Sequence, residues 1–211
     1  MKNYLLISLT AIAAIIIFFA SNLTSQDQPT NVKAFNASIN KEKSGDYNGA
    51  ISELQKVYSD YKSDYLFNLR LGWLYYANAD FNNSKKYYST AEKINPSSVE
   101  AKLGLVFPLA ALNQWDEVKR LYGEIIKLDF NNYTANLRLG QILLNSSDFP
   151  NAKTFLEKVY KLYPGEYEPN LSLGYTYYYL GNILKAKMLL TNALMLSPND
   201  SLATAGLKLV K

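Results

Sequence analysis

The sequence repeats itself at an interval of about 34 residues, and this period limits the possible folds more than any other feature. Three segments carry nearly the same phrase: LRLGWLYYANADF at 69–81, LRLGQILLNSSDF at 137–149 and LSLGYTYYYLGNI at 171–183. Gly140 and Gly174 are one period apart, and Gly72 lies two periods before Gly140. A period of this length predicts a repeat architecture in which each unit is one supersecondary element.

Each period has the pattern of two helices followed by a stop. Apolar and small residues recur at helical spacing on both sides of a polar turn, and three units close with Pro96, Pro164 and Pro198. Small residues at paired positions let two helix backbones approach closely, and proline prevents the second helix from continuing. Three columns of residues keep the period without a slip: Tyr47, Phe81, Trp115, Phe149 and Ile183; Ala50, Ser84, Val118, Ala152 and Ala186; Val57, Ala91, Ile125, Val159 and Ala193.

These columns resemble a known motif. The second unit shows it most fully, with Leu71-Gly72, Tyr75, Phe81, Ser84, Tyr88, Ala91 and Pro96. This pattern resembles the tetratricopeptide repeat, a 34-residue helix-turn-helix unit. The resemblance implies an all-α fold, a right-handed α-solenoid of about five 34-residue repeats within residues 33–200. The expected units lie near 31–64, 65–98, 99–132, 133–166 and 167–200, and a C-terminal capping helix is expected at 201–211.

Two units depart from the pattern. The first has Ser38 where glycine belongs and lacks the closing proline, as expected for a terminal repeat that caps the array. The third has Val106 in the glycine column and Pro108 inside its first helix. An interior proline removes a helical hydrogen bond, so we expect a bend near Phe107.

The first twenty residues predict export or anchoring. After Lys2, an uncharged apolar stretch runs from Tyr4 to Ala20, long enough for roughly 25 Å of helix. We expect a membrane anchor, or a signal peptide if this stretch is cleaved, followed by a polar tether at 21–32. Lys2 favours a cytoplasmic N-terminus, which would place the repeat domain outside the cytoplasm, periplasmic or extracellular, and secreted after cleavage.

Composition removes several function classes. The chain has no cysteine and no histidine, so disulfides, thiolate nucleophiles, imidazole-based zinc sites and histidine triads are excluded. The formal charge of +4 is spread thinly, without the basic patch that nucleic-acid binding needs. We therefore expect no metal, cofactor or nucleic acid, and no enzymatic activity.

The resemblance also implies a binding surface. In this family the first helices line a concave groove in which extended peptides or partner helices bind. The outward side chains expected there are Arg70, Trp73, Tyr76, Phe107, Arg138, Gln141, Tyr175, Tyr178 and Tyr179. Such a groove suits a segment that offers carboxylates to arginine and apolar side chains to tyrosine and tryptophan. The alternative is that the aromatic residues pack between helices and that the arginines belong to a solvated face.

Two functions are compatible with these features. The first is a membrane-tethered or exported scaffold that binds a peptide or protein partner in the groove. The alternative is an enzyme, or enzyme subunit, that processes envelope glycans with carboxylates, which requires two acids held together in a cleft. The acids considered for that role are scattered over second helices and loops: Asp46, Glu53, Glu92, Glu117, Glu124 and Glu157.

Overall fold

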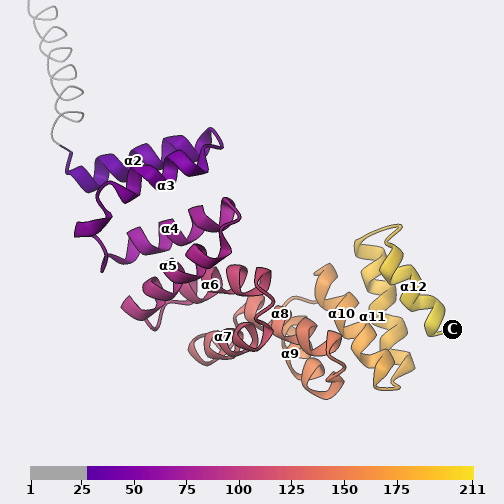
Figure 1. The fold of residues 1–211 in the computed structure, drawn as a ribbon. Helices are drawn as coiled ribbons and strands as arrows, with labels where there is room; N and C mark the ends of the chain where they lie inside the picture. The colour runs from indigo at the N-terminus through magenta and orange to yellow at the C-terminus, as the bar shows by residue number, and fades with distance from the viewer. Residues whose placement is uncertain (1–27) are drawn as a thin grey trace, which may run out of the picture. The chain divides into compact units, whose positions relative to one another are not determined.

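A computed structural model describes residues 28–211 of the chain. Within this range the structure consists of eleven α-helices, one short 3₁₀ helix and connecting turns, with no strand (Figure 1). The predicted anchor at 1–20 and most of the predicted tether at 21–32 lie outside the described residues. Among residues 28–211, no helix is both long enough and apolar enough to cross a membrane.

The described residues divide into two compact units, 28–87 and 88–211, with the boundary inside one helix. The first contains α2 (Thr30–Lys43), α3 (Tyr47–Gln55), η1 (Tyr58–Asp60) and α4 (Tyr65–Ala77), and α5 (Phe81–Ile94) crosses the boundary. The second contains α6 (Val99–Ala111), α7 (Trp115–Leu128), α8 (Tyr133–Asn145), α9 (Phe149–Leu162), α10 (Tyr167–Tyr179), α11 (Ile183–Leu196) and α12 (Ser201–Leu209).

The same turn joins the two helices of every repeat. A residue with positive φ recurs once per period, namely Gly45, Ala79, Asn113, Ser147 and Gly181, with φ between 57° and 77°. The residue after it donates its backbone N–H to a carbonyl five positions earlier, as Asp80 does to Tyr75 and Asp148 does to Leu143, each at 2.9 Å. The side chain of that residue then caps the second helix in most repeats. Asp46, for example, accepts a 2.8 Å hydrogen bond from the backbone N–H of Gly49.

Small residues hold the paired helices close together. In the fourth repeat, a Cβ added at Gly140 would lie 2.6 Å from Cγ of Leu156. In the fifth, one added at Gly174 would lie 2.9 Å from Cγ of Leu190. Both leucines are fully buried, so the glycines are needed for this approach. In the first unit Ser38, which replaces glycine, is fully buried as well.

Pro108 does not interrupt α6. The helix is continuous from Val99 to Ala111 and has the same thirteen-residue length as α4, α8 and α10. Pro108 is buried, and its carbonyl accepts a 3.0 Å hydrogen bond from the backbone N–H of Leu112 at the end of the helix. The missing N–H therefore falls near the C-terminal end of the helix, and the bend expected near Phe107 stays a prediction.

A buried asparagine ties the first helix to the loop before it in repeats two, four and five. Asn68, Asn136 and Asn170 are at most 1% exposed and stand at the period of the repeat. Each side-chain amide donates to two loop carbonyls, four and six positions earlier, at 2.7–3.1 Å. The carbonyls of Asp64 and Asn132 also accept the backbone N–H of the same asparagine, so the side chain adds a second bond there and ties the loop to the helix start. The asparagines are therefore structural residues. The sequence analysis did not identify this column, although its period was readable.

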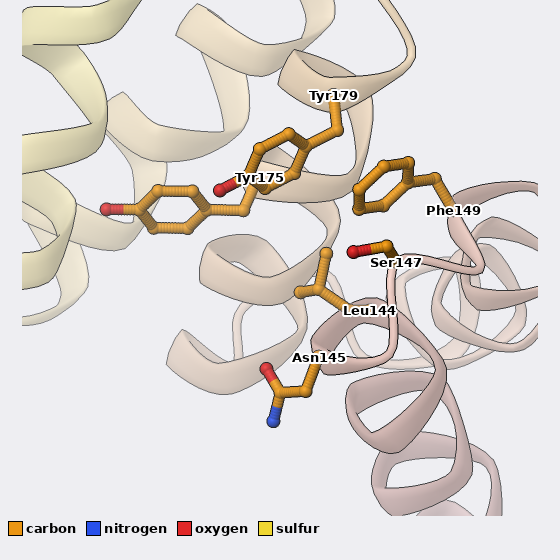
Figure 2. A pocket seen from close by; sticks show the side chains of 6 residues that line it. All are labelled: Leu144, Asn145, Ser147, Phe149, Tyr175 and Tyr179. Atoms are coloured by element: carbon orange, nitrogen blue, oxygen red, sulfur yellow. The ribbon is translucent and has the colours of Figure 1, made fainter.

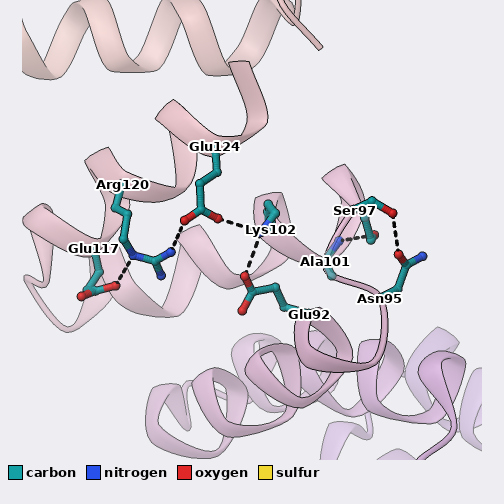
Figure 3. Close-up of polar contacts among 9 residues, drawn as sticks. Glu92, Asn95, Ser97, Ala101, Lys102, Glu117, Arg120 and Glu124 are labelled. Carbon is teal, nitrogen blue, oxygen red and sulfur yellow. Dashed lines mark hydrogen bonds and ion pairs between the residues drawn. The ribbon is translucent and has the colours of Figure 1, made fainter. Parts of the chain in front are cut away.

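In the third repeat the same column holds Lys102, and its chemistry changes (Figure 3). The Lys102 side chain is 4% exposed, and its Nζ lies 2.8 Å from a carboxylate oxygen of Glu92 on α5 and 2.8 Å from one of Glu124 on α7. Arg120 adds a second cation beside Glu124 at 2.5 Å. Burial alone lowers the pKa of Lys102, but the hydrogen bonds to Glu124 and Glu92 outweigh burial and raise it above 10.5. Ionic contacts thus tie α6 to both α5 and α7 at this position.

Candidate functional site

Three of the predicted groove residues, Arg70, Trp73 and Tyr76, lie on α4, and two of them contact a carboxylate of α2. Nη2 of Arg70 lies 2.6 Å from Oε2 of Glu42, and the indole N–H of Trp73 donates to Oε1 of the same carboxylate at 2.6 Å. Burial raises the pKa of Glu42, but the hydrogen bonds from Trp73 and Arg70, with the charge of Arg70, lower it below 4.5. The Arg70 side chain is only 15% exposed. The guanidinium of Arg70 is therefore already paired with a carboxylate of its own chain.

The aromatic residues beside Arg70 remain accessible. Trp73 is 41% exposed, and its ring centroid is 6.3 Å from that of Tyr76. Tyr76 also contacts Phe81 at the start of α5, with ring centroids 5.6 Å apart. The surface of α4 therefore presents aromatic area, while the charge of Arg70 is neutralised locally.

Within residues 88–211, the polar groove residues Arg138 and Gln141 link α8 to α10. Nη1 of Arg138 contacts Oε1 of Glu168 at 2.8 Å and donates to the side-chain oxygen of Gln141 at 2.8 Å. Gln141 in turn donates to the hydroxyl of Ser172 at 3.1 Å. Arg138 remains 44% exposed, so this pair is solvated and its contribution to stability is small. Phe107, half exposed on α6, does not line either of the hollows described below.

Two tyrosines of α10, Tyr175 and Tyr179, line one wall of an open hollow. This cavity of about 340 Å³ lies at the turn between α8 and α9, where α10 faces the start of α9 (Figure 2). Its lining residues are Leu144, Asn145, Ser147, Phe149, Tyr175 and Tyr179. The volume lies at the lower end of the range of small-molecule pockets and can hold one or two side chains of a bound segment.

Two contacts fix the aromatic walls of this hollow. Tyr179 stacks on Phe149, with ring centroids 4.6 Å apart and an angle of 9° between the rings. The hydroxyl of Tyr175 donates to the backbone carbonyl of Leu202 on α12 at 2.6 Å. Tyr178 does not line the hollow but meets the edge of Tyr179 at 5.2 Å. The hollow is thus largely formed before any ligand arrives, which reduces the entropy lost on binding.

A second hollow also borders the end of α8. It also has a volume of about 340 Å³, and it is lined by Trp115, Lys119, Ile142, Asn145 and Ser146. Asn145 borders both hollows. Trp115 is 47% exposed, so its indole offers apolar surface beside the ammonium of Lys119. Lys119 is itself paired with Asp116 at 2.8 Å, an exposed contact that a ligand can replace at low cost.

Of the predicted groove residues, the structure brings Tyr175 and Tyr179 together at one hollow and joins Arg138 to Gln141 nearby. The sequence analysis missed Phe149 and Trp115 as site residues, although it found them in the aromatic column after the turn. In a packed repeat this column fills the gap between helices. Here it leaves enough area exposed to line both hollows. No group of three or more acidic residues placed to hold a metal occurs in residues 28–211.

The sequence matches the family model of the tetratricopeptide repeat at residues 67–98, 133–166 and 167–200. The chain is a tetratricopeptide repeat protein. The matched segments coincide with the second, fourth and fifth of the predicted units, which are the three that carry the closing proline.

Solved structures share the fold of this tetratricopeptide repeat protein. YrrB, described as a TPR protein with an unusual peptide-binding site, is 19% identical with a TM-score of 0.72, covering 90% of this chain and 97% of its own. MamA is 21% identical with a TM-score of 0.71, covering 79% and 91%. A tetratricopeptide repeat protein from Parabacteroides merdae is 12% identical with a TM-score of 0.76, covering 86% and 72%. A search of the curated proteins gave no match.

Proposed function

We propose that this tetratricopeptide repeat protein is a non-enzymatic scaffold that binds a peptide or protein partner, and that the hollow lined by Tyr175, Tyr179 and Phe149 is its main contact. The observation that carries the proposal is this aromatic hollow of about 340 Å³ on the surface of α10. Exposed, preorganised tyrosines are characteristic of binding hot spots, because they offer large area at low entropic cost. The peptide-binding site named for YrrB lends support through the shared fold.

The internal ion pairs define the chemistry of the partner. Arg70 is largely buried against Glu42, and Arg138 is paired with Glu168, so an acidic segment would have to displace a carboxylate of the chain at either arginine. The partner would therefore be recognised mainly by an aromatic or branched apolar side chain that enters the hollow, and by contacts of its amides with Asn145 and Gln141. This revises the expected reliance on carboxylates and predicts weak salt dependence of binding.

Peptide selection on the purified full chain tests this proposal. Ligands selected from a random peptide display library would be remeasured by fluorescence anisotropy with Tyr179→Ala and with Tyr163→Ala as a matched control. Both tyrosines are about half exposed, and Tyr163 contacts one ring where Tyr179 contacts two, but only Tyr179 lines the hollow. Loss of a hot-spot aromatic costs about 2 kcal/mol, so we expect roughly a thirtyfold weaker Kd for Tyr179→Ala alone. Equal effects of both substitutions would refute the site.

The acids considered for an enzyme are engaged elsewhere. Glu92 and Glu124 hold Lys102, Glu117 pairs with Arg120, and Glu53 pairs with Lys56. Asp46 caps α3, and Glu157 accepts from the hydroxyl of Tyr177. No observation favours a carboxylate pair in a cleft, so we propose the scaffold alone.

Membrane tethering or export through residues 1–20 is part of the same proposal and rests on the apolar stretch between Tyr4 and Ala20. Fractionation of cells that express the full chain, with mass spectrometry of its N-terminal peptide, tests it. Recovery of intact residues 1–20 with the membrane would support an anchor. A mature N-terminus after Ala20 would support export, and an intact chain found free of membranes would refute both.

A further inference from the structure

The outer face of α11 carries an apolar stripe that the other second helices do not have. Leu184 is 85% exposed, Met188 49% and Met195 67%, and Thr191 on the same face is also exposed. These residues follow one another at intervals of four, three and four, so they form a single straight row along the helix. Exposed apolar side chains occur singly on most surfaces, but a continuous row marks an interaction site.

The equivalent positions on the other second helices show whether the repeat requires apolar residues in this row. The residues one period earlier, on α9, are Pro150, Thr154, Glu157 and Lys161, and those on α7 are Asp116, Arg120, Gly123 and Lys127. On α5 they are Asn82, Lys86, Ser89 and Lys93. The same geometric row is therefore largely polar or charged in three repeats and apolar in the fifth. Packing within the repeat does not require apolar residues here.

Thr191 is compatible with an apolar contact. Its hydroxyl donates to the backbone carbonyl of Lys187 at 2.7 Å, so its only donor is used within α11. The methyl group is then the part available to a neighbour. The row consequently presents four side chains of the kind found along the contact line of paired helices.

We propose that this row pairs α11 with α11 of a second copy of the chain, antiparallel and across a two-fold axis. The intervals of four, three and four read the same in both directions, so an antiparallel copy places Leu184 against Met195 and Met188 against Thr191. A surface that complements itself in this way is what a closed two-fold dimer requires. The surface lies on a different helix from the aromatic hollow, so the pairing is separate from partner binding.

Charge supports the antiparallel direction. The charged residues of α11 are Lys185 and Lys187, both in its N-terminal half, and it has no basic residue in its last turn. Lys185 is held by Tyr177, with Nζ 3.0 Å from the phenol oxygen and 4.7 Å from the ring centroid. Lys187, which flanks the row, would lie towards the C-terminal half of the second copy. The helix dipole is negative at that end, so the interaction is attractive.

A lipid surface is a less suitable occupant than a second copy. Helices that lie on membranes carry several lysines or arginines around the apolar face, and here only Lys185 and Lys187 flank the row, with Lys185 held by Tyr177. The dimer contact would be small: one fourteen-residue helix buries less area than a standard interface of about 800 Å² per partner. The expected dimer is therefore weak and dependent on concentration.

The absence of native cysteine makes a direct test possible. Two differently tagged full-length copies, one Leu184→Cys and the other Met195→Cys, would be coexpressed and oxidised in the cell fraction where the protein is found. We expect a disulfide between the two variants and no dimer from either alone. Like positions in the antiparallel pair would be about 16 Å apart along the axis, beyond the reach of a disulfide. The control uses Asp116→Cys with Lys127→Cys, exposed residues at the same spacing on α7.

The outcomes separate the possibilities. A mixed disulfide confined to the α11 variants supports the proposal. Dimers from either single variant would indicate parallel pairing, equal crosslinking of the α7 control would indicate random collision, and no crosslink would indicate no pairing. Each of these three results overturns the proposal.

A second measurement tests the pairing without introduced cysteines. Analytical ultracentrifugation of the full chain in mild detergent would compare the wild type with Met188→Thr/Met195→Lys, which replaces both methionines by polar residues of the kind found on α9. We expect the wild type to shift from monomer to dimer with concentration and the variant to remain monomeric with unchanged helical circular dichroism. A wild type that stays monomeric throughout, or a variant that dimerises equally, overturns the proposal. Tyr179→Ala should leave the dimer unchanged, because it affects the hollow alone.

Discussion

Replacing Lys102 by Met removes a buried cation from between two carboxylates and keeps a long side chain in its place. Lys102 is 3% exposed, while the side chains of Glu92 and Glu124 keep 20% and 31% of their area in solvent. Removing one partner of a fully buried ion pair costs about 3–5 kcal/mol. Because both carboxylates can still be partly hydrated and Glu124 keeps Arg120, we expect a smaller loss of about 2–3 kcal/mol.

The residue column suggests a matched variant. Lys102→Asn also removes the charge, but it restores the residue that repeats two, four and five carry at this position. By analogy with Asn136, its amide would donate to the carbonyls four and six positions earlier, those of Ser98 and Pro96. Two such hydrogen bonds contribute about 0.5–1.5 kcal/mol each, so Lys102→Asn should be more stable than Lys102→Met by about 1–2 kcal/mol.

Urea unfolding followed by circular dichroism measures these differences, with Lys119→Met as a control. Lys119 makes an exposed contact with Asp116, so its substitution should change the free energy of unfolding by less than about 0.5 kcal/mol. A Lys102→Met protein as stable as the wild type would refute the reasoning. So would a Lys102→Asn protein that is less stable than Lys102→Met, because the hydrogen bonds of the column would then be absent.

The ion pairs of Lys102 also predict how the free energy of unfolding depends on pH. The hydrogen bond from Lys102 lowers the pKa of Glu124 below 4.5, so its stabilisation is present above that pH and is lost as the pH falls through the folded-state pKa. The pKa of Lys102 is raised above 10.5, so its stabilisation is present below that pH and is lost as the pH rises through the folded-state pKa. The difference in unfolding free energy between wild type and Lys102→Met should therefore be largest between these limits. A difference that does not shrink at any pH as the solution is acidified from pH 7 until the wild type unfolds would contradict the role of the ion pair.

Two further predictions concern glycine and the turns. Gly140→Ala should cost about 1–3 kcal/mol, because its Cβ would lie 2.6 Å from the buried Cγ of Leu156. Gly123→Ala, with no atom within 4 Å of the new Cβ, should gain about 0.5–1 kcal/mol. Thermal unfolding that ranks these two variants in the opposite order would refute the packing. Ala79→Gly should raise the thermal midpoint, since Ala79 has φ 59° where Gly45 and Gly181 occupy the same turn. A lower midpoint would show that the left-handed turn is not strained.

Much of the fold could be predicted from the sequence because each local pattern occurs in several repeats. The Leu-Gly pair, the aromatic residue after the turn and the closing proline each recur at fixed positions, so a chance match in one repeat is corrected by the others. The turn and the asparagine column obeyed the same period and were overlooked. The positive-φ position holds glycine in only two of five repeats, and a buried asparagine looks like a surface residue until its carbonyl partners are known.

The candidate site was only partly readable. The sequence identified Tyr175, Tyr179 and Arg138 as outward residues of first helices, because side-chain direction follows from helical periodicity. It did not show that Arg70 on α4 would be neutralised by Glu42, which lies on α2 in the preceding repeat. Such pairing depends on how neighbouring helices are rotated and spaced, and helical spacing within one segment carries no information about that.

The sequence by itself determined the period, the all-helical class and the family, because these depend on local rules of spacing, turn and stop that operate within a single repeat. Tertiary structure decided which tyrosines enclose a hollow, which charges are paired, and that Leu184, Met188 and Met195 remain exposed. These properties depend on what each side chain meets across the helix interface. Two residues in equivalent columns, such as Lys161 and Met195, can therefore share a backbone position and still present different chemistry to the outside.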